Sequence, residues 1–182
     1  MTTDLSENIR LRRPDETDEE PMAGFCNNIK IWNNVRDLMP FPYSREDAAD
    51  FIRMCQAESP TVTFAIEYEG KFSGCIGLKI QSDIYRLSAE LGYWVGETFW
   101  CRGIATRAVE LITDYGFRQL GMIRIFCGVI DYNKASQRVL EKSGYTLEAV
   151  CKQAVFKNGR ICDEYRYAKC LPLTQPPSAN SQ

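Results

Sequence analysis

Hydrophobic and polar positions change their spacing several times along the chain, and each change predicts a different element. Apolar residues three or four positions apart predict helices over residues 21–35, 45–56, 106–120 and 133–143. Alternating or continuous apolar runs predict strands over residues 8–13, 61–67, 71–80, 87–95, 123–130, 145–156 and 161–168. Strands at both ends and helices between the later strands indicate the α+β class, as a mixed α/β sandwich with helices on both faces of a twisted sheet.

The length of 182 residues suits one buried core better than two. We therefore expect a single domain over residues 9–171. A polar N-terminus, residues 1–8, precedes this domain, and a proline-rich tail, residues 172–182, follows it. Neither end has the apolar residues of a core, so we expect a flexible N-terminus and a disordered tail.

Charge and hydropathy exclude several classes of function. The net charge is −2, and the 22 basic and 24 acidic residues are spread along the chain, unlike the basic cluster of a nucleic-acid-binding surface. No apolar run approaches the roughly 18 residues of a membrane-spanning helix, and residues 1–13 lack the apolar region of a signal peptide. We therefore expect a cytoplasmic protein that binds neither nucleic acid nor a membrane.

The chain has no histidine, which removes whole classes of mechanism. Nucleophiles activated by histidine and histidine-rich metal sites are excluded. Acid–base chemistry near neutral pH must therefore use a carboxylate, tyrosine, cysteine, lysine or water. The eight cysteines include no C-x-x-C pair, and most lie in apolar runs. We expect reduced thiols in the core and no metal.

The most distinctive local sequence joins the strand predicted over residues 87–95 to the next helix. It reads Arg102-Gly103-Ile104-Ala105-Thr106. Glycine lets a ligand approach the backbone closely, and the free amides at the start of a helix attract an anion. The segment therefore predicts a cradle for a pyrophosphate, although a glycine before a helix is also an ordinary turn residue.

Three segments carry a resemblance to a known family: AELGYWVGETFWCRGIATRAVELI, FRQLGMIRI and NKASQRVLEKSGYTLE. In this order and spacing they resemble the core of the GNAT superfamily of N-acetyltransferases, and within it the RimJ and RimL branch that acts on ribosomal-protein N-termini. The resemblance implies a mixed sheet of six or seven strands. In such a sheet the strands at residues 87–95 and 123–130 run side by side and splay apart, and acetyl-CoA lies in the split.

The resemblance also assigns residues to the cofactor. The splayed strand pairs with pantetheine, the cradle binds the pyrophosphate, and the following helix reaches the cofactor from its start. The implied cofactor-binding residues are Tyr93, Trp94, Val95, Arg102, Gly103, Ile104, Ala105, Thr106, Asn133 and Ser136.

Several positions depart from the family pattern. Trp100 stands where the cradle often begins with Gln or Arg, and Cys101 stands where many relatives have Gly. The tyrosine acid of many members is replaced by Leu140, and a carboxylate of some ribosomal-branch members by Val155. Ser136 is then the candidate acid, since it resembles the serine proposed to protonate the leaving thiol in that branch.

Glu90 is the candidate base, because it resembles the glutamate that histone-type members use for this role. Strand alternation places Glu90 and Trp94 on one face of the predicted strand, where both can line a substrate groove. The alternative is a carboxylate in solvent or in a salt bridge.

These expectations describe an acetyl-CoA-dependent N-acetyltransferase that acts as a monomer or homodimer by direct attack of an amine in a ternary complex. A protein N-terminal α-amine is the preferred acceptor, because its pKa of about 8 makes it easier to deprotonate than a lysine. Two alternatives stay open: a small amine such as a polyamine or an aminoglycoside, and a module that binds acyl-CoA without turnover.

Overall fold

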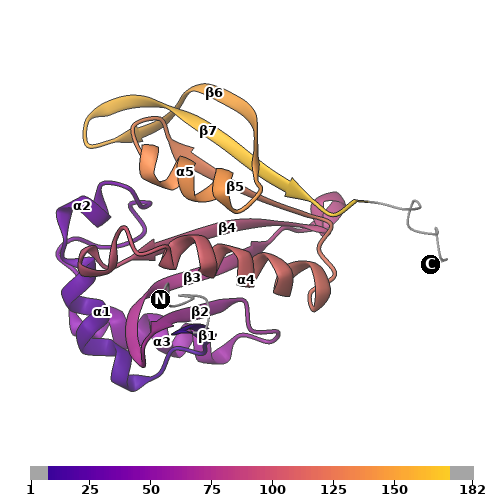
Figure 1. The fold of residues 1–182 in the computed structure, drawn as a ribbon. Coiled ribbons are helices and arrows are strands. Elements are labelled where there is room, and N and C mark those ends of the chain that lie inside the picture. Colours follow the sequence, from indigo (N-terminus) through magenta and orange to yellow (C-terminus); the bar gives the residue numbers. More distant parts are fainter. Residues whose placement is uncertain (1–7, 173–182) are drawn as a thin grey trace, which may run out of the picture.

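The computed structural model describes residues 8–172, and in it seven strands form one mixed sheet in the order β1-β2-β3-β4-β5-β7-β6 (Figure 1). The strands are β1 (Ile9–Arg12), β2 (Thr63–Tyr68), β3 (Lys71–Ile80), β4 (Ser88–Val95), β5 (Arg124–Ile130), β6 (Thr146–Lys157) and β7 (Arg160–Cys170). The α-helices are α1 (Glu19–Cys26), α2 (Ile29–Trp32), α3 (Arg45–Ala57), α4 (Ile104–Arg118) and α5 (Lys134–Lys142). Short 3-10 helices are η2 (Glu16–Asp18), η3 (Asp83–Tyr85) and η4 (Glu97–Phe99). The expected α+β sheet architecture is confirmed.

Strands β4 and β5 form the parallel pair in the middle of this sheet, and they pair over a short length. The paired positions run from Ser88 opposite Arg124 to Glu90 opposite Phe126. Beyond Glu90, β4 continues along β3 to Val95, whereas β5 follows β7. The two halves of the sheet therefore separate from this point, and Figure 1 shows β4 and β5 diverging.

Helices cover both faces because successive strand residues point to opposite sides. On β2, Ile66 packs into the cluster of α4 that contains Ile112. Its neighbour Ala65 packs into the opposite cluster, which contains Ile52 of α3. Figure 1 shows α4 and α5 on the near side of the sheet, so this near face is here called the α4/α5 face and the other the α1/α3 face.

Helix α3 begins where its sequence predicts. The Ser44 side chain accepts the Asp47 amide at 3.0 Å, and the Asp47 carboxylate accepts the Ser44 amide at 2.7 Å. This reciprocal capping satisfies two backbone donors at the start of the helix.

The single helix expected over residues 21–35 is wrong, because two adjacent asparagines divide it into α1 and α2. The Asn27 side chain donates to the Ala23 carbonyl at 3.0 Å and so helps to end α1. The Asn28 side chain accepts the Lys30 amide at 2.8 Å and caps the start of α2. Asparagine side chains that bond to nearby backbone compete with the helix interior.

The segment that joins α2 to α3 crosses to the other half of the sheet and contacts the turn between β6 and β7. The Lys157 ammonium donates to Asp37 at 2.6 Å and lies 3.6 Å from the centroid of the Trp32 ring. The Asn158 side chain donates to the Asn33 side chain at 2.7 Å. The two halves of the sheet are therefore connected at the open end of the split as well as at Glu90.

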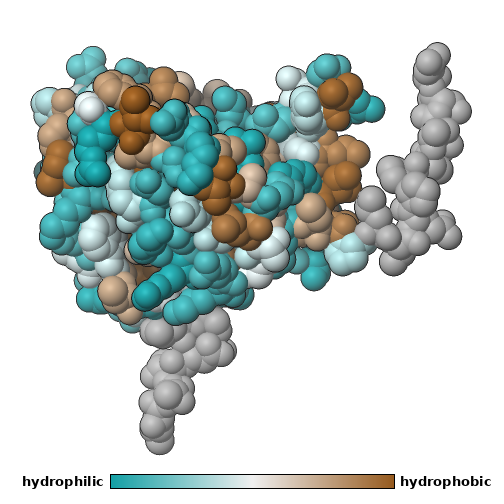
Figure 2. All heavy atoms as spheres, turned by 90° about the horizontal axis from the view of Figure 1, so that it is seen from above, coloured by the Kyte–Doolittle hydropathy of each residue, from teal (hydrophilic) through white to brown (hydrophobic). Residues whose placement is uncertain are grey.

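The face above β6 and β7 has a mixed surface. Figure 2 views the molecule from this side and shows hydrophobic groups separated by hydrophilic residues. The large exposed apolar residues of these two strands are Leu147, Val150, Phe156 and Ile161. No helix among residues 8–172 is both long and apolar enough to span a membrane. The expected flexible N-terminus and disordered tail lie, apart from residues 8 and 172, outside the described residues.

Candidate active site

A cavity of about 1740 Å³ occupies the split between β4 and β5. Its lining comes from both faces of the sheet, with Gly103 and Ser136 on the α4/α5 face and Glu90 and Trp94 on the α1/α3 face. Typical small-ligand pockets measure roughly 300–1,000 Å³. The cavity is therefore larger than a typical site for one small ligand.

The predicted anion cradle lies at the start of α4. Gly103 has a φ of 75° and provides no side-chain cap for this helix. The first amides of α4 are consequently free to bind an anion. A Cβ at Gly103 would have no atom within 4 Å, so the space above the backbone is open. Arg102, Ile104, Ala105 and Thr106 line the same cavity, and the Ile104 side chain is otherwise buried in the core.

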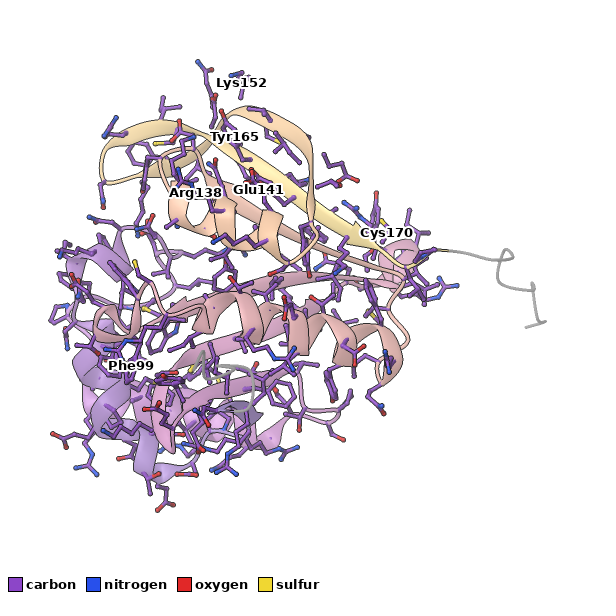
Figure 3. All side chains as sticks on the ribbon, in the orientation of Figure 1. Phe99, Arg138, Glu141, Lys152, Tyr165 and Cys170 are labelled. Atoms are coloured by element: carbon purple, nitrogen blue, oxygen red, sulfur yellow. The ribbon has the colours of Figure 1, made fainter. Side chains whose placement is uncertain are left out.

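Two arginines add positive charge to this side of the cavity. Arg102 lies 6.0 Å from the centroid of the Phe99 ring, and Arg138 lines the cavity from α5. Figure 3 labels Phe99 in the lower part of the molecule and Arg138 on α5 in the upper part. A phosphorylated ligand bound between Arg102 and Arg138 would be attracted by positive charge from both halves of the sheet.

The end of β4 differs from the expectation for a free strand edge. The Trp100 indole N–H donates to the Val95 carbonyl at 2.7 Å. One acceptor position of this carbonyl is therefore already occupied, whereas Tyr93 lines the cavity and has no such contact from Trp100. Cys101, which follows, is exposed and has a φ of 61°, a conformation that favours glycine.

Ser136 and Asn133 lie together at the start of α5. The Asn133 side chain accepts the Ser136 amide at 3.1 Å and thereby caps the helix. The Ser136 hydroxyl oxygen lies 2.8 Å from the phenol oxygen of Tyr93 across the split. Burial raises the pKa of the Tyr93 phenol well above its ordinary value, so this group stays protonated and can donate a hydrogen bond.

Glu90 lies on the opposite face and forms an ion pair with Arg36 of the segment between α2 and α3. The Glu90 side chain is 20% exposed and that of Arg36 is 63% exposed. The salt bridge expected as the alternative role is thus present. Glu90 nevertheless lines the cavity, next to the last pair of residues that joins β4 to β5.

Glu164 of β7 is a second carboxylate in this part of the cavity. Burial raises the pKa of the Cys127 thiol to about 12, and the charges of Glu90 and Glu164 add to this effect. Both carboxylates therefore lie near Cys127, on β5 beside the split. The thiol is protonated at neutral pH and is a poor nucleophile.

Sequence reasoning missed Glu164, Arg36 and the contact between Trp100 and Val95. Alternation alone places Glu164 on one face of a strand, and no local pattern shows that this face borders the split. Arg36 lies in a segment between helices, where spacing carries little information. Among residues 8–172, no group of three or more Cys, Asp or Glu residues is placed to hold a metal ion.

The comparisons with known proteins agree with this geometry. A family model described as an acetyltransferase (GNAT) domain matches residues 8–146. A ribosomal-protein-serine acetyltransferase of Escherichia coli K12 is 27% identical over 177 residues, which are 93% of this chain and 97% of the relative. The spermidine N(1)-acetyltransferase of the same strain is 28% identical over 103 residues, which are 57% and 55% of the two chains.

Two solved structures share the fold. The microcin C7 self-immunity acetyltransferase MccE, in complex with acetyl-CoA and AMP, has a TM-score of 0.78 and 26% identity, covering 91% of this chain and 93% of its own. RimL, a ribosomal L7/L12 α-N-protein acetyltransferase in complex with CoA, has a TM-score of 0.79 and 22% identity, covering 92% and 96%. The resemblance to the ribosomal-protein branch is confirmed, and the alternative of a module without turnover is set aside because the matched family and relatives are acetyltransferases. Since the family model spans more than half of its length, the chain belongs to the GNAT family of N-acetyltransferases.

Proposed function

We propose that this GNAT enzyme transfers the acetyl group of acetyl-CoA to the N-terminal α-amine of a protein. The observation that carries the proposal is the cavity at the split, which offers a free helix N-terminus on one face of the sheet and a carboxylate on the other. A ribosomal-protein-serine acetyltransferase that matches over 97% of its own length supports a polypeptide acceptor.

Acetyl-CoA, in this proposal, binds on the α4/α5 face. The amides from Gly103 to Thr106 bind the pyrophosphate, with Arg102 beside them. The backbone of β4 at Tyr93 pairs with pantetheine, since β4 has no strand partner on the side of the split beyond Glu90. The acetyl group then lies at the split.

The acceptor enters from the α1/α3 face and must lose a proton before it attacks. For an α-amine of pKa about 8 this costs roughly 1.4 kcal/mol at pH 7, and for a lysine of pKa about 10.4 nearly 5 kcal/mol. Glu90 receives the proton, directly or through water, after Arg36 releases the carboxylate. A chain without histidine is thereby better suited to an α-amine than to a lysine.

The reaction proceeds by direct attack, with both substrates in the cavity. The amine nitrogen forms a bond to the thioester carbonyl carbon, and the bond from this carbon to sulfur breaks. Ser136 gives its hydroxyl proton to the leaving thiolate, and Tyr93 supplies a proton to Ser136 through their 2.8 Å contact. The Tyr93 phenolate then regains a proton from water, which restores the enzyme. No acyl-enzyme is needed, since the Cys127 thiol at the split has a pKa of about 12.

A polyamine is the second candidate acceptor, because a spermidine N(1)-acetyltransferase matches 57% of this chain. The carboxylates Glu90 and Glu164 provide the negative charge that a cationic amine requires. The match covers 55% of that relative, which is why the polypeptide acceptor is preferred.

Release of free CoA thiol, measured with three acceptors, tests the proposal. The first is a peptide with a free N-terminus and acetylated lysines, the second the same peptide with a blocked N-terminus and free lysines, and the third spermidine. We expect the highest kcat/KM with the first, and mass spectrometry should place the acetyl group on its α-amine. Turnover with spermidine alone, or with the blocked peptide alone, would refute the α-amine acceptor.

A further inference from the structure

Glu164 reaches the α1/α3 face of the cavity by crossing β5. It pairs with Ile130 across the strands, and Gly128 lies two positions before Ile130 on the same face. A Cβ at Gly128 would lie 2.5 Å from Glu164 Oε2 and 2.7 Å from its Cδ. The carboxylate therefore occupies the space that any larger residue at position 128 would fill.

One oxygen of this carboxylate is bound and the other is free. Arg166 donates to Oε1, through Nε at 3.1 Å and Nη2 at 2.7 Å. Oε2, the oxygen over Gly128, accepts no hydrogen bond from the residues that the structure describes. Since Glu164 lines the cavity and its side chain is 20% exposed, Oε2 is available to a bound ligand.

Glu90 and Glu164 approach the same place from opposite halves of the sheet. Glu90 pairs with Phe126 of β5, and the Glu164 carboxylate lies over Gly128, which is two positions further along β5 on the same face. Both carboxylates raise the pKa of the Cys127 thiol, after the larger effect of burial. Both also favour the charged form of Arg166. Because Glu90 lies next to the start of the split, the proposed base and the free oxygen of Glu164 flank the position of the reacting amine.

We propose that Glu164 is a specificity-determining residue, whose Oε2 binds a positively charged N–H group of the acceptor next to the amine that is acetylated. The inference rests on the proposed function and narrows its acceptor class. A carboxylate accepts hydrogen bonds from cations strongly and repels other carboxylates. The site therefore selects acceptors with a basic group beside the reacting amine and rejects those with an acidic group there.

The test uses binding to the protein saturated with CoA, measured by calorimetry, together with KM for turnover. One acceptor pair consists of two short peptides that differ at the second residue, lysine or glutamate. The other pair is spermidine and butylamine, which has one amine. In the unmodified protein we expect the cationic member of a pair to bind roughly tenfold tighter or more. In Glu164→Gln the ratio of the two affinities within a pair should be close to one.

Two further variants separate charge at this site from general effects. Glu148→Gln removes an exposed carboxylate that pairs with Arg124 outside the cavity, so it should keep the full ratio. Gly128→Ala keeps the charge of Glu164 but displaces its carboxylate, so it should lower the ratio as Glu164→Gln does. Thermal melting identifies any variant that fails to fold.

Each result then has one meaning. A ratio that falls in Glu164→Gln and Gly128→Ala but not in Glu148→Gln supports the proposal. An unchanged ratio in folded Glu164→Gln protein, or no preference for the cationic member of either pair in the unmodified protein, overturns it. If the peptides fail and spermidine binds, the α-amine acceptor fails, and the spermidine pair still decides the role of Glu164.

Discussion

The phenol oxygen of Tyr93 lies 2.8 Å from the hydroxyl oxygen of Ser136, and this contact joins β4 to α5 across the split of the sheet. The two side chains come from different halves of the molecule, 43 positions apart in the sequence. A tyrosine is consequently present beside the candidate acid, although Leu140 occupies the position where many GNAT enzymes carry their tyrosine.

Replacing Tyr93 by Phe should lower kcat by roughly tenfold or more and leave the KM for acetyl-CoA almost unchanged. The variant keeps the ring and removes the hydroxyl that supplies a proton to Ser136, and acid–base assistance is typically worth 10²- to 10⁴-fold. Steady-state kinetics measures both constants. Ser136→Ala should have a similar effect, and unchanged turnover in both variants would leave the leaving thiolate without an acid.

Gly103→Ala should weaken acetyl-CoA binding by tenfold or more, measured by calorimetry. A methyl group there would project into the space above the cradle, where no protein atom lies within 4 Å. Gly121→Ala is the matched control, since Gly121 has a φ of 67°, equally open surroundings and no contact with the cavity. Both variants should lose about 1 kcal/mol of stability from backbone strain, so equal acetyl-CoA affinity in the two would argue against the cradle.

Glu90→Gln should reduce turnover at pH 7 by 10²- to 10⁴-fold, if Glu90 removes the acceptor proton. The loss should shrink at pH 9, because an α-amine of pKa about 8 is then mostly neutral without help. The pH dependence of kcat/KM distinguishes this role from a structural one. A variant that loses the same factor at every pH would indicate that Glu90 only holds Arg36.

The buried thiols should make the protein less stable as the pH rises above about 9. Burial raises the pKa values of Cys26, Cys55 and Cys127 to about 12. Between pH 9 and 12 these thiols ionise in the unfolded chain but not in the folded one, so folding loses up to about 1.4 kcal/mol per thiol and pH unit. Below pH 8 the effect is absent.

Urea unfolding at several pH values measures this slope. Cys26→Ala should reduce the change of the unfolding free energy with pH by up to about 1.4 kcal/mol per pH unit, which corresponds to one proton. Cys170→Ala, at an exposed position, should not change it. Equal slopes in the two variants would show that other groups cause the loss of stability.

Cys101→Gly should raise the free energy of unfolding by about 1 kcal/mol, because the φ of 61° at this position strains a residue with a side chain. Thermal or urea unfolding measures the change, with Cys170→Gly as a comparison at a strand end. A decrease in stability would mean that the Cys101 side chain makes contacts that outweigh the strain.

The elements with strong patterns were predictable from the sequence. Helix α3 follows its capping residue Ser44, and the strands around the Asn158-Gly159 turn lie where alternation places them. Asn27 and Asn28 indicate a break between two helices, since asparagine side chains readily bond to nearby backbone, and the expectation of one long helix did not take this into account.

The site was predictable only in part, because its geometry depends on strand pairing. The motif from Arg102 to Thr106 has a local signature, as does the capping residue Asn133. The point of separation at Glu90 depends on where β5 leaves β4 for β7, and no local pattern records that choice. The role of Gly128 could not be predicted either, since Gly128 makes room for the carboxylate of Glu164, which lies on another strand.

The contacts of Lys157 with Asp37 and Trp32 have a mechanical consequence for the enzyme. A split that is joined only at its closed end can widen when a ligand enters it. In this protein the two halves of the sheet are joined at the closed end of the split by the strand pairs up to Glu90 and at its open end by Lys157. The width of the split is therefore restrained at both ends. Substrates therefore enter along the split from the two faces, and the enzyme selects them by their cross-section in addition to their charge.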